Sequence, residues 1–236
     1  MSEYNESRWA EREFSGEYAQ NADRMIMERD RLIGVLVAFY GHFLGKEKKV
    51  SVLDLGCGDG GLTLEIAREF GNVSPTLVDG SPDMLEKAKA NLHTAGAQFV
   101  EASFQELLSG KFDLPEPEYG FIFSSLAVHH LESAEKADLY SYAYEVLSRG
   151  GYFMNIDVVL APSEGLEDWY MDNWRDWLDE RGEGLGIDIV SRYKDNRDNR
   201  PGTLEAQLLY LKRAGFSDVD CYYKNGIFAV FGGRKP

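Results

Sequence analysis

The sequence predicts an α/β fold, in which a mostly parallel sheet carries helices on both faces and ends in an antiparallel hairpin. Short apolar runs alternate with amphipathic helical patterns between residues 50 and 159, which is typical of parallel strands joined by helices. Near the C-terminus, Asn225-Gly226 separates two further strand-like runs, and this dipeptide in that setting is a strong hairpin signal. We therefore expect the last two strands to pair antiparallel at an edge of the sheet.

The individual elements follow from hydrophobic spacing and from residues that begin or end helices. Apolar residues at spacings of three and four predict a helix over residues 17–44. Strands are expected at residues 50–55, 76–78, 98–102, 119–124 and 152–159. Helices are expected at residues 62–70, from Pro82 to about residue 95, at 134–147 and at 203–214. The final hairpin is expected to pair residues 217–223 with residues 227–231.

The chain length suits one domain in four parts. These parts are N-terminal helices (1–47), a core (48–160), a helical cap insert (161–202), and the last helix with its hairpin (203–236). The insert carries a helically spaced apolar set, namely Leu166, Trp169, Tyr170, Trp174, Trp177 and Leu178. These side chains either line a pocket beneath the cap or form the core of the cap itself.

Composition argues against several classes of partner. The chain has 25 Lys and Arg residues against 40 Asp and Glu residues, a net charge of −15. Because nucleic acids are bound mainly through Lys and Arg, we do not expect a nucleic-acid partner. Residues 192–200 are the only basic candidate segment, and Asp195 and Asp198 interrupt it. A monomer and a homodimer both stay open.

The sequence also favours a cytoplasmic location. No apolar run is long enough to predict a membrane span, and residues 1–12 lack the basic-then-apolar layout of a secretory signal. Cys57 and Cys221 do not form a disulfide framework, and no cluster of His and Cys predicts a metal.

A glycine-rich loop at residues 54–61 is the strongest chemical signal. It joins a strand to a helix, so backbone amides at the helix start face any group bound there. Read literally, Gly56, Gly58 and Gly61 form the dinucleotide fingerprint, with Asp79 where a ribose acid is expected. However, Asp54 would repel a pyrophosphate and suits a cationic amino group.

These segments together resemble the class I S-adenosylmethionine-dependent methyltransferases. The similar stretches are VLDLGCGDGG at 52–61, LVDGSPDML at 77–85, SSLAVHHLE at 124–132 and LSRGGYFMNID at 147–157. The resemblance covers residues 48–160 and 203–236 and implies a Rossmann-like sheet. It also implies methyl transfer to a small molecule, with S-adenosyl-L-methionine as cofactor and S-adenosyl-L-homocysteine as product.

The resemblance implies specific roles in binding the cofactor. Gly56, Gly58 and Gly60 would let the loop approach the methionine part, and Asp54 would face its amino group. Asp79 would accept from both ribose hydroxyls, and Met84 would pack on the adenine. The full implied set is Asp54, Gly56, Cys57, Gly58, Gly60, Asp79, Gly80, Ser81, Met84, Ser103, Phe104, Ser124 and Leu126. The family often has an acid where this chain has Ser103, so that contact with the adenine differs here.

Three residues are candidates for the chemical step. His129 and His130 follow the fourth strand, and a histidine can deprotonate a hydroxyl or amine near neutral pH. Asp157 on the fifth strand would orient the nucleophile. All three also have ordinary structural interpretations, in packing or local hydrogen bonding. The cap's many acids hint at a cationic acceptor, and a solvated helix face explains them equally well.

Three other functions stay open. One is a nicotinamide-dependent oxidoreductase, since the glycine loop alone does not separate the two cofactors. Another is an enzyme similar to the carboxy-S-adenosylmethionine synthases, whose last helix and hairpin resemble residues 204–234. Those enzymes carry an arginine near the position of Tyr210, which counts against this alternative. The third is a non-catalytic protein that only binds the cofactor.

Overall fold

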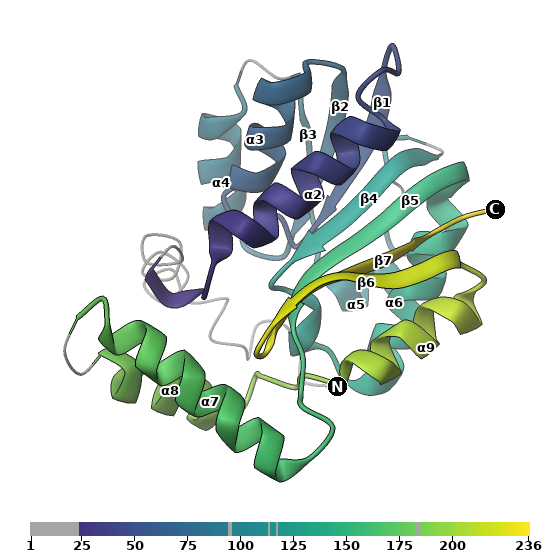
Figure 1. Cartoon of the computed structure of the whole chain (residues 1–236). Helices are drawn as coiled ribbons and strands as arrows, with labels where there is room; N and C mark the ends of the chain where they lie inside the picture. The colour runs from purple at the N-terminus through teal and green to yellow at the C-terminus, as the bar shows by residue number, and fades with distance from the viewer. Residues whose placement is uncertain (1–23, 94–95, 113, 117, 183–184) are drawn as a thin grey trace.

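The protein is built around one seven-stranded sheet with the strand order β3-β2-β1-β4-β5-β7-β6. The computed structural model describes residues 24–93, 96–112, 114–116, 118–182 and 185–236. The strands are β1 (Val50–Leu55), β2 (Val73–Asp79), β3 (Gln98–Glu101), β4 (Tyr119–Ser125), β5 (Leu147–Val158), β6 (Ser217–Asn225) and β7 (Phe228–Arg234). The first five are parallel, and β7 runs antiparallel between β5 and β6 (Figure 1). This confirms the predicted sheet and its terminal hairpin.

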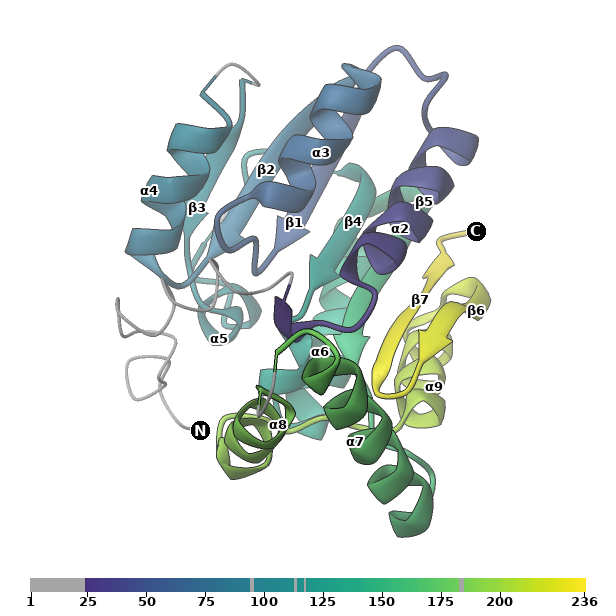
Figure 2. The same ribbon diagram turned by 60° about the vertical axis from the view of Figure 1, so that its left-hand side comes forward.

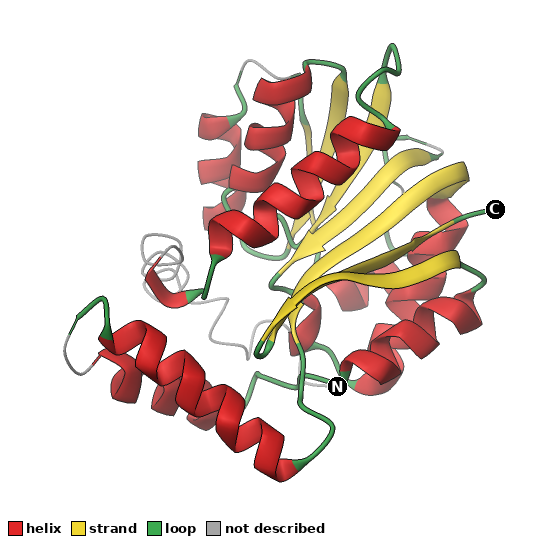
Figure 3. Cartoon of the chain, in the orientation of Figure 1, coloured by secondary structure: helices red, strands yellow, loops and turns green. Residues whose placement is uncertain are grey.

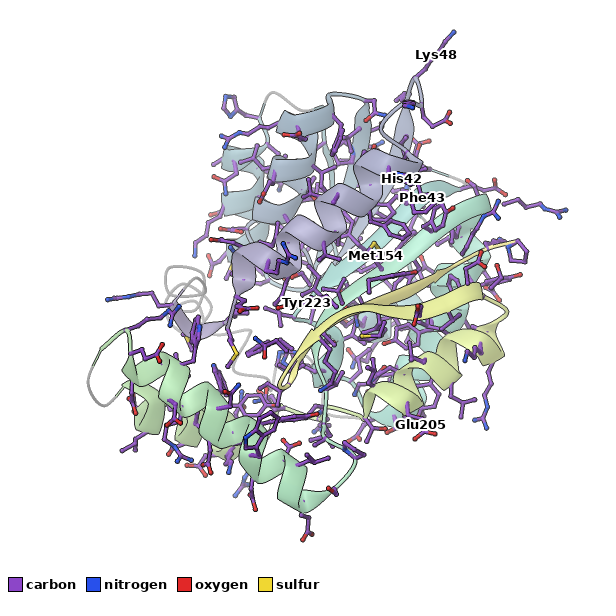
Figure 4. All side chains as sticks on the ribbon, viewed as in Figure 1. His42, Phe43, Lys48, Met154, Glu205 and Tyr223 are labelled. Atoms are coloured by element: carbon purple, nitrogen blue, oxygen red, sulfur yellow. The ribbon has the colours of Figure 1, made fainter. Side chains whose placement is uncertain are left out.

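Helices cover both faces of the sheet (Figure 3). One face carries α2 (Arg29–Phe43), α3 (Gly61–Phe70) and α4 (Pro82–Asn91), and the other carries α5 (Phe104–Leu108), α6 (Ser133–Val146) and α9 (Leu204–Ala214). Each layer encloses an apolar core, and a smaller third cluster lies between α4 and β2. Met154, for example, is fully buried on the α2 side, whereas Lys48 and Glu205 point outward (Figure 4).

Local sequence explains where most of these helices begin and end. Ser81 caps α4, since its Oγ accepts from the backbone N–H of Met84 at 3.4 Å, and Pro82 occupies the first turn. Gly71 ends α3 with a left-handed φ of 64°. The short α5 was not expected; a reciprocal capping box between Ser103 and Glu106 begins it.

Some boundaries differ from the predictions. The strand β2 begins at Val73 rather than at residue 76, and α4 ends at Asn91 rather than near residue 95. The strand β5 begins at Leu147, because Leu147 pairs with Tyr119 before an irregularity shifts the register. Of the helix expected over residues 17–44, the described part contains α2, and residues 17–23 lie outside the described ranges.

Two helices, α7 (Glu164–Asp179) and α8 (Leu185–Asp195), occupy the insert between β5 and α9. They pack against each other and lie beyond the carboxyl ends of the parallel strands (Figures 1 and 2). Trp174 is buried against Phe228 and Tyr193, and its indole N–H donates to the carbonyl oxygen of Met25 at 2.9 Å. Trp174 therefore forms part of the core beneath the insert, whereas Trp169 is 59% exposed. No described helix is long and apolar enough to cross a membrane.

Candidate functional site

The carboxyl ends of β1, β2, β3 and β4 surround one cavity, as expected for a ligand site in an open α/β sheet. Most of the residues proposed for the cofactor line this cavity. They are Asp54, Gly56, Cys57, Gly58, Asp79, Gly80, Ser81, Met84, Ser103, Phe104 and Leu126. The structure therefore brings together side chains from four separate loops, as the sequence motifs required.

The glycine loop owes its shape to left-handed backbone angles at Gly56 and Gly58, where φ is 71° and 55°. A Cβ on Gly56 would lie 2.5 Å from the Cβ of Ala127, so only glycine lets the loop pack against the end of β4. A Cβ on Gly58 would meet nothing within 4 Å. The space beside Gly58 is therefore available to a ligand.

Gly60 has a different environment and lies outside the cavity lining. A Cβ there would approach side-chain atoms of Leu92 and Leu77 at 2.9 and 3.0 Å. This glycine lets α3 pack closely on α4 and β2, which is a different role from the ligand approach that the motif implied.

Asp79 ties the glycine loop to the loop after β2. Its two carboxylate oxygens accept from the backbone N–H groups of Gly58 and Ser81, each at 2.8 Å. Burial raises the pKa of Asp79, and the two amide donors oppose that rise. The carboxylate is thereby held at the mouth of the loop with acceptor capacity left for further donors.

Asp54 is a buried carboxyl at the end of β1, with 2% of its surface exposed. The Thr63 hydroxyl donates to it at 2.6 Å, yet burial and the charges of Asp79 and Asp59 raise its pKa to about 7. Three acids in one cavity wall favour a cation beside them. An amino group or a sulfonium fits this wall, whereas a pyrophosphate does not.

The end of β4 positions Leu126 against the cavity through an uncommon backbone conformation. Its φ is 54°, which costs a non-glycine residue about 1–2 kcal/mol, and its N–H donates to the carbonyl oxygen of Ile156 at 2.7 Å. Ser124 lies two residues earlier, is fully buried and donates to the carbonyl oxygen of Leu55 at 2.6 Å. Ser124 therefore joins β4 to β1 and is not part of the lining.

The three candidates for the chemical step separate into a buried pair and a cavity residue. His129 Nδ1 lies 2.6 Å from Asp157 Oδ1, and both side chains are buried outside the lining. His130 lines the cavity, and its Nδ1 lies 3.0 Å from the carbonyl oxygen of Asp198. Because a carbonyl only accepts, Nδ1 carries the proton and Nε2 is the basic nitrogen of the neutral ring. Burial lowers the pKa of His130 well below its usual range, so the ring is neutral at pH 7.

A chain segment after α8, here called the return segment (residues 196–202), closes the far side of the cavity. Its Arg200 N–H donates to the carbonyl oxygen of His129 at 2.8 Å, and Lys136 Nζ donates to the carbonyl oxygen of Arg200 at 2.6 Å. Arg200 and Asp198 both line the cavity, as does Arg29 from α2. Sequence reasoning missed these three residues, because no local pattern connects them to the glycine loop.

The insert contributes less to the cavity than its position suggested. None of its tryptophans or of its helix acids is in the described lining. Most of the acids are exposed, in agreement with a solvated helix face. Among the described residues, no group of three or more His, Cys, Asp or Glu is placed to hold a metal ion.

Several known proteins are similar to this chain in sequence. A methyltransferase domain model matches residues 52–151. A carboxy-S-adenosyl-L-methionine synthase from Nautilia profundicola is 22% identical over 194 residues, covering 80% of this chain and 78% of the relative. A malonyl-[acyl-carrier protein] O-methyltransferase from Ilyobacter polytropus is 29% identical over 108 residues, covering 45% and 37%.

Solved structures share the fold at low sequence identity. An O-methyltransferase family protein from Burkholderia thailandensis superposes with a TM-score of 0.67 at 13% identity, covering 98% of this chain and 62% of its own. Human N-acetylserotonin methyltransferase in complex with S-adenosylmethionine gives 0.54 at 20% identity, covering 96% and 59%. The chain thus spans about three fifths of the length of these two structures.

The fold and the acid-lined glycine loop define a Rossmann-like protein that binds an adenosyl cofactor with a cationic amino-acid part. The methyltransferase domain match and the relatives make this more specific. These similarities support a class I S-adenosylmethionine-dependent methyltransferase, and the chain is an enzyme that uses S-adenosylmethionine.

Proposed function

We propose that this enzyme transfers a methyl group from S-adenosylmethionine to a small-molecule acceptor by in-line displacement. The observation that carries the proposal is the continuity of one cavity, from Asp79 and the glycine loop to His130 and Arg200. A donor held by the loop would present its sulfonium toward the end of β4. The net charge of −15 also supports a small molecule over a nucleic acid, and two free cysteines suit a cytoplasmic enzyme.

The cofactor fits the cavity wall through charge and backbone shape. In this proposal Asp79 accepts hydrogen bonds from the ribose hydroxyls, and Asp54 faces the amino group directly or through water. Gly56 and Gly58 allow the methionine part to approach the loop. Met84 packs on the adenine, and Ser103, which caps α5 and lines the cavity, lies near the adenine amine.

The chemical step needs mainly positioning, because the sulfonium is already activated. A protein that holds acceptor and methyl about 3 Å apart and excludes water supplies most of the catalysis. We propose that His130 Nε2 accepts the acceptor's O–H or N–H hydrogen and takes that proton as the methyl is transferred. The neutral ring and the Nδ1 contact with Asp198 support this role.

The proposal is tested in two stages. Calorimetry is expected to give S-adenosylhomocysteine binding with no response to NAD or NADP. Incubation with S-adenosylmethionine and pools of phenols, amines and organic acids is then expected to release S-adenosylhomocysteine together with a methylated pool member. Tight cofactor binding without product from any pool would contradict the proposal.

Asp79→Ala tests the proposed ribose contact, and Asp168→Ala on the exposed face of α7 is the matched control. We expect Asp79→Ala to weaken S-adenosylhomocysteine binding by about 1–3 kcal/mol, since charged hydrogen bonds are lost. Asp168→Ala is expected to leave S-adenosylhomocysteine binding unchanged. Equal effects of the two substitutions on binding would contradict the proposed contact between Asp79 and the ribose.

A second function is supported by the carboxy-S-adenosyl-L-methionine synthases among the relatives. Two of them cover 80% of this chain, at 22% and 27% identity. Against this alternative, Tyr210 packs with the core between α9 and the sheet, and it is not in the described cavity lining. Mass spectrometry of the cofactor product separates the two functions: methyl transfer yields S-adenosylhomocysteine, whereas a synthase yields a carboxylated sulfonium.

A further inference from the structure

The acceptor side of the cavity holds an arginine and a lysine, set among acids, in a protein whose net charge is −15. This side is formed by the short η3 helix (Val128–His130) and by the return segment that lies against it. Its ionisable groups include His130 of η3, Asp198 and Arg200 of the return segment, and Lys136 of α6. The acids Glu132, Glu135 and Asp157 lie close to these cations.

Arg200 is held firmly by its backbone. Its N–H donates to the carbonyl oxygen of His129 at 2.8 Å, and its own carbonyl oxygen accepts from Lys136 at 2.6 Å. The guanidinium Nε lies 3.1 Å from Glu132 Oε1, in a pair whose side chains are 33% and 63% exposed. Such an exposed pair contributes little stability.

Lys136 adds a second cation behind the lining. Its side chain is 1% exposed, and its ammonium group donates to the carbonyl oxygens of Leu131 and Arg200. Burial lowers its pKa to about 8, so the group is mostly charged at neutral pH. Burial is the largest cause of the lowered pKa of His130. The charges of His129, Lys136 and Arg200 lower this pKa further, because a neighbouring positive charge disfavours the protonated ring.

The cofactor can account for only one of the arginines in the cavity. Its methionine part has a single carboxylate, whereas Arg29 and Arg200 both line the described part of the cavity. Arg29 comes from α2, an element separate from η3 and the return segment. Arg200 adjoins His129 and Lys136, so it belongs to the acceptor side.

We propose that the acceptor is an organic acid whose carboxylate is bound by Arg200 while its hydroxyl or amino group faces His130. This inference rests on the proposed methyl transfer and adds the substrate class. A carboxylate matches the planar guanidinium, and the apolar side chain of Leu131, next to η3, would contact the rest of the molecule. The weaker hint of a cationic acceptor depended on insert acids that lie outside the described lining.

The test uses the protein saturated with S-adenosylhomocysteine and pairs of probes that differ only in charge. Calorimetry is run with 4-hydroxybenzoate, mandelate and phenylalanine, and with the amide of each acid. At least one acid is expected to bind about tenfold or more tightly than its amide, as one charged hydrogen-bonded pair predicts. Arg200→Gln is expected to abolish this preference and to leave S-adenosylhomocysteine affinity unchanged.

Two further variants keep the result interpretable. Arg192→Gln removes an exposed arginine of α8 that pairs with Asp188, and it is expected to behave as wild type. Arg200→Lys keeps the charge without the planar fork and is expected to retain a reduced preference for the acid. If Arg200→Lys still prefers the acid to its amide, this result supports the proposal even if Arg200→Gln proves unstable in thermal unfolding.

Several outcomes would overturn the proposal. These are equal binding of acids and amides, no binding of any acid, equal loss in Arg192→Gln and Arg200→Gln, and a stronger preference for phenyl phosphate than for the carboxylates. Binding of S-adenosylhomocysteine and product formation from the acceptor pools are measured separately. Failure of the acid preference is therefore distinguishable from failure of methyl transfer itself.

Discussion

His129 Nδ1 lies 2.6 Å from Asp157 Oδ1 in the interior, although the adjacent His130 lines the cavity. Asp157 Oδ1 also accepts from the N–H of Val158 at 2.9 Å, and Asn155 donates to Oδ2 at 3.3 Å. Asp157 thus fixes the end of β5 and the η3 helix relative to each other. The geometry favours a positioning role for this pair.

Asp157→Ala is expected to lower the free energy of unfolding by about 3 kcal/mol or more, because it leaves a buried histidine without its carboxylate. Asp157→Asn keeps an acceptor for His129 and Val158 and is expected to cost much less. Denaturant unfolding measures both variants. Calorimetry is expected to give unchanged S-adenosylhomocysteine binding in Asp157→Asn, and a large loss there would move this pair into the binding site.

His130→Asn is expected to distinguish the roles of the two ring nitrogens of His130. The asparagine amide reproduces the donor at Nδ1 toward the Asp198 carbonyl oxygen but offers no basic atom at the position of Nε2. Stability and cofactor affinity are expected to stay near wild type. The methyl-transfer rate is expected to fall about 100-fold, the low end for a positioned base, because the lowered pKa weakens the ring as a base. A rate equal to wild type across the pH range would exclude a proton-accepting role.

The buried Asp54 carboxyl predicts a specific pH dependence of stability. Its pKa rises from 3.8 to about 7 on folding, so the folded protein binds this proton more tightly than the unfolded chain. Stability attributable to Asp54 therefore falls as pH rises from about 4 to about 7. The Asp54→Asn variant lacks this loss of stability, and its amide oxygen can still accept from the Thr63 hydroxyl.

We expect the unfolding free energy of Asp54→Asn relative to wild type to increase over that pH range, by roughly 4 kcal/mol at most. Denaturant unfolding at a series of pH values checks this. Comparing the two proteins at each pH cancels the other titrating groups. If the unfolding free energies of the two proteins changed with pH in parallel, Asp54 would already be ionised in the folded protein at low pH.

Cofactor binding is expected to show the opposite trend with pH. A cationic amino group beside Asp54 favours its ionised form, so binding lowers the pKa of this carboxyl and releases a proton. S-adenosylhomocysteine is therefore expected to bind more tightly as pH rises from about 5 to about 7. Calorimetry in two buffers of different ionisation enthalpy measures the released proton, and Asp54→Asn is expected to release none at this site.

Gly58 and Gly71 offer a matched pair for the glycine loop. Both have a left-handed φ, 55° and 64°, and an added Cβ meets nothing within 4 Å at either position. Substitution by alanine is expected to cost each about 1 kcal/mol of stability from backbone strain. Calorimetry is expected to show weaker S-adenosylhomocysteine binding in Gly58→Ala alone, since Gly71 ends α3 away from the cavity. Equal affinities in both variants would argue against close approach of the ligand to Gly58.

Much of the fold was predictable because its signals are local. The glycine loop follows β1 as expected, and Ser81 and Pro82 begin α4. The final hairpin forms as expected but turns at Gly226-Ile227, one residue beyond the predicted Asn225-Gly226. Each of these signals acts within a few residues, through backbone angles or a cap. The early start of β5 was not predictable, because it depends on pairing between Leu147 and Tyr119 across the sheet.

The binding loop and the fold class were therefore determined by the sequence itself, since glycines, caps and apolar runs act on their own neighbourhood. Only the tertiary structure decided the roles of His129 and His130. The two rings lie side by side in the η3 helix, with centroids 3.9 Å apart, yet His129 contacts Asp157 whereas His130 lines the cavity. It also brought Arg200 to the cavity, through a backbone hydrogen bond to His129 of η3 that leaves no pattern in the sequence.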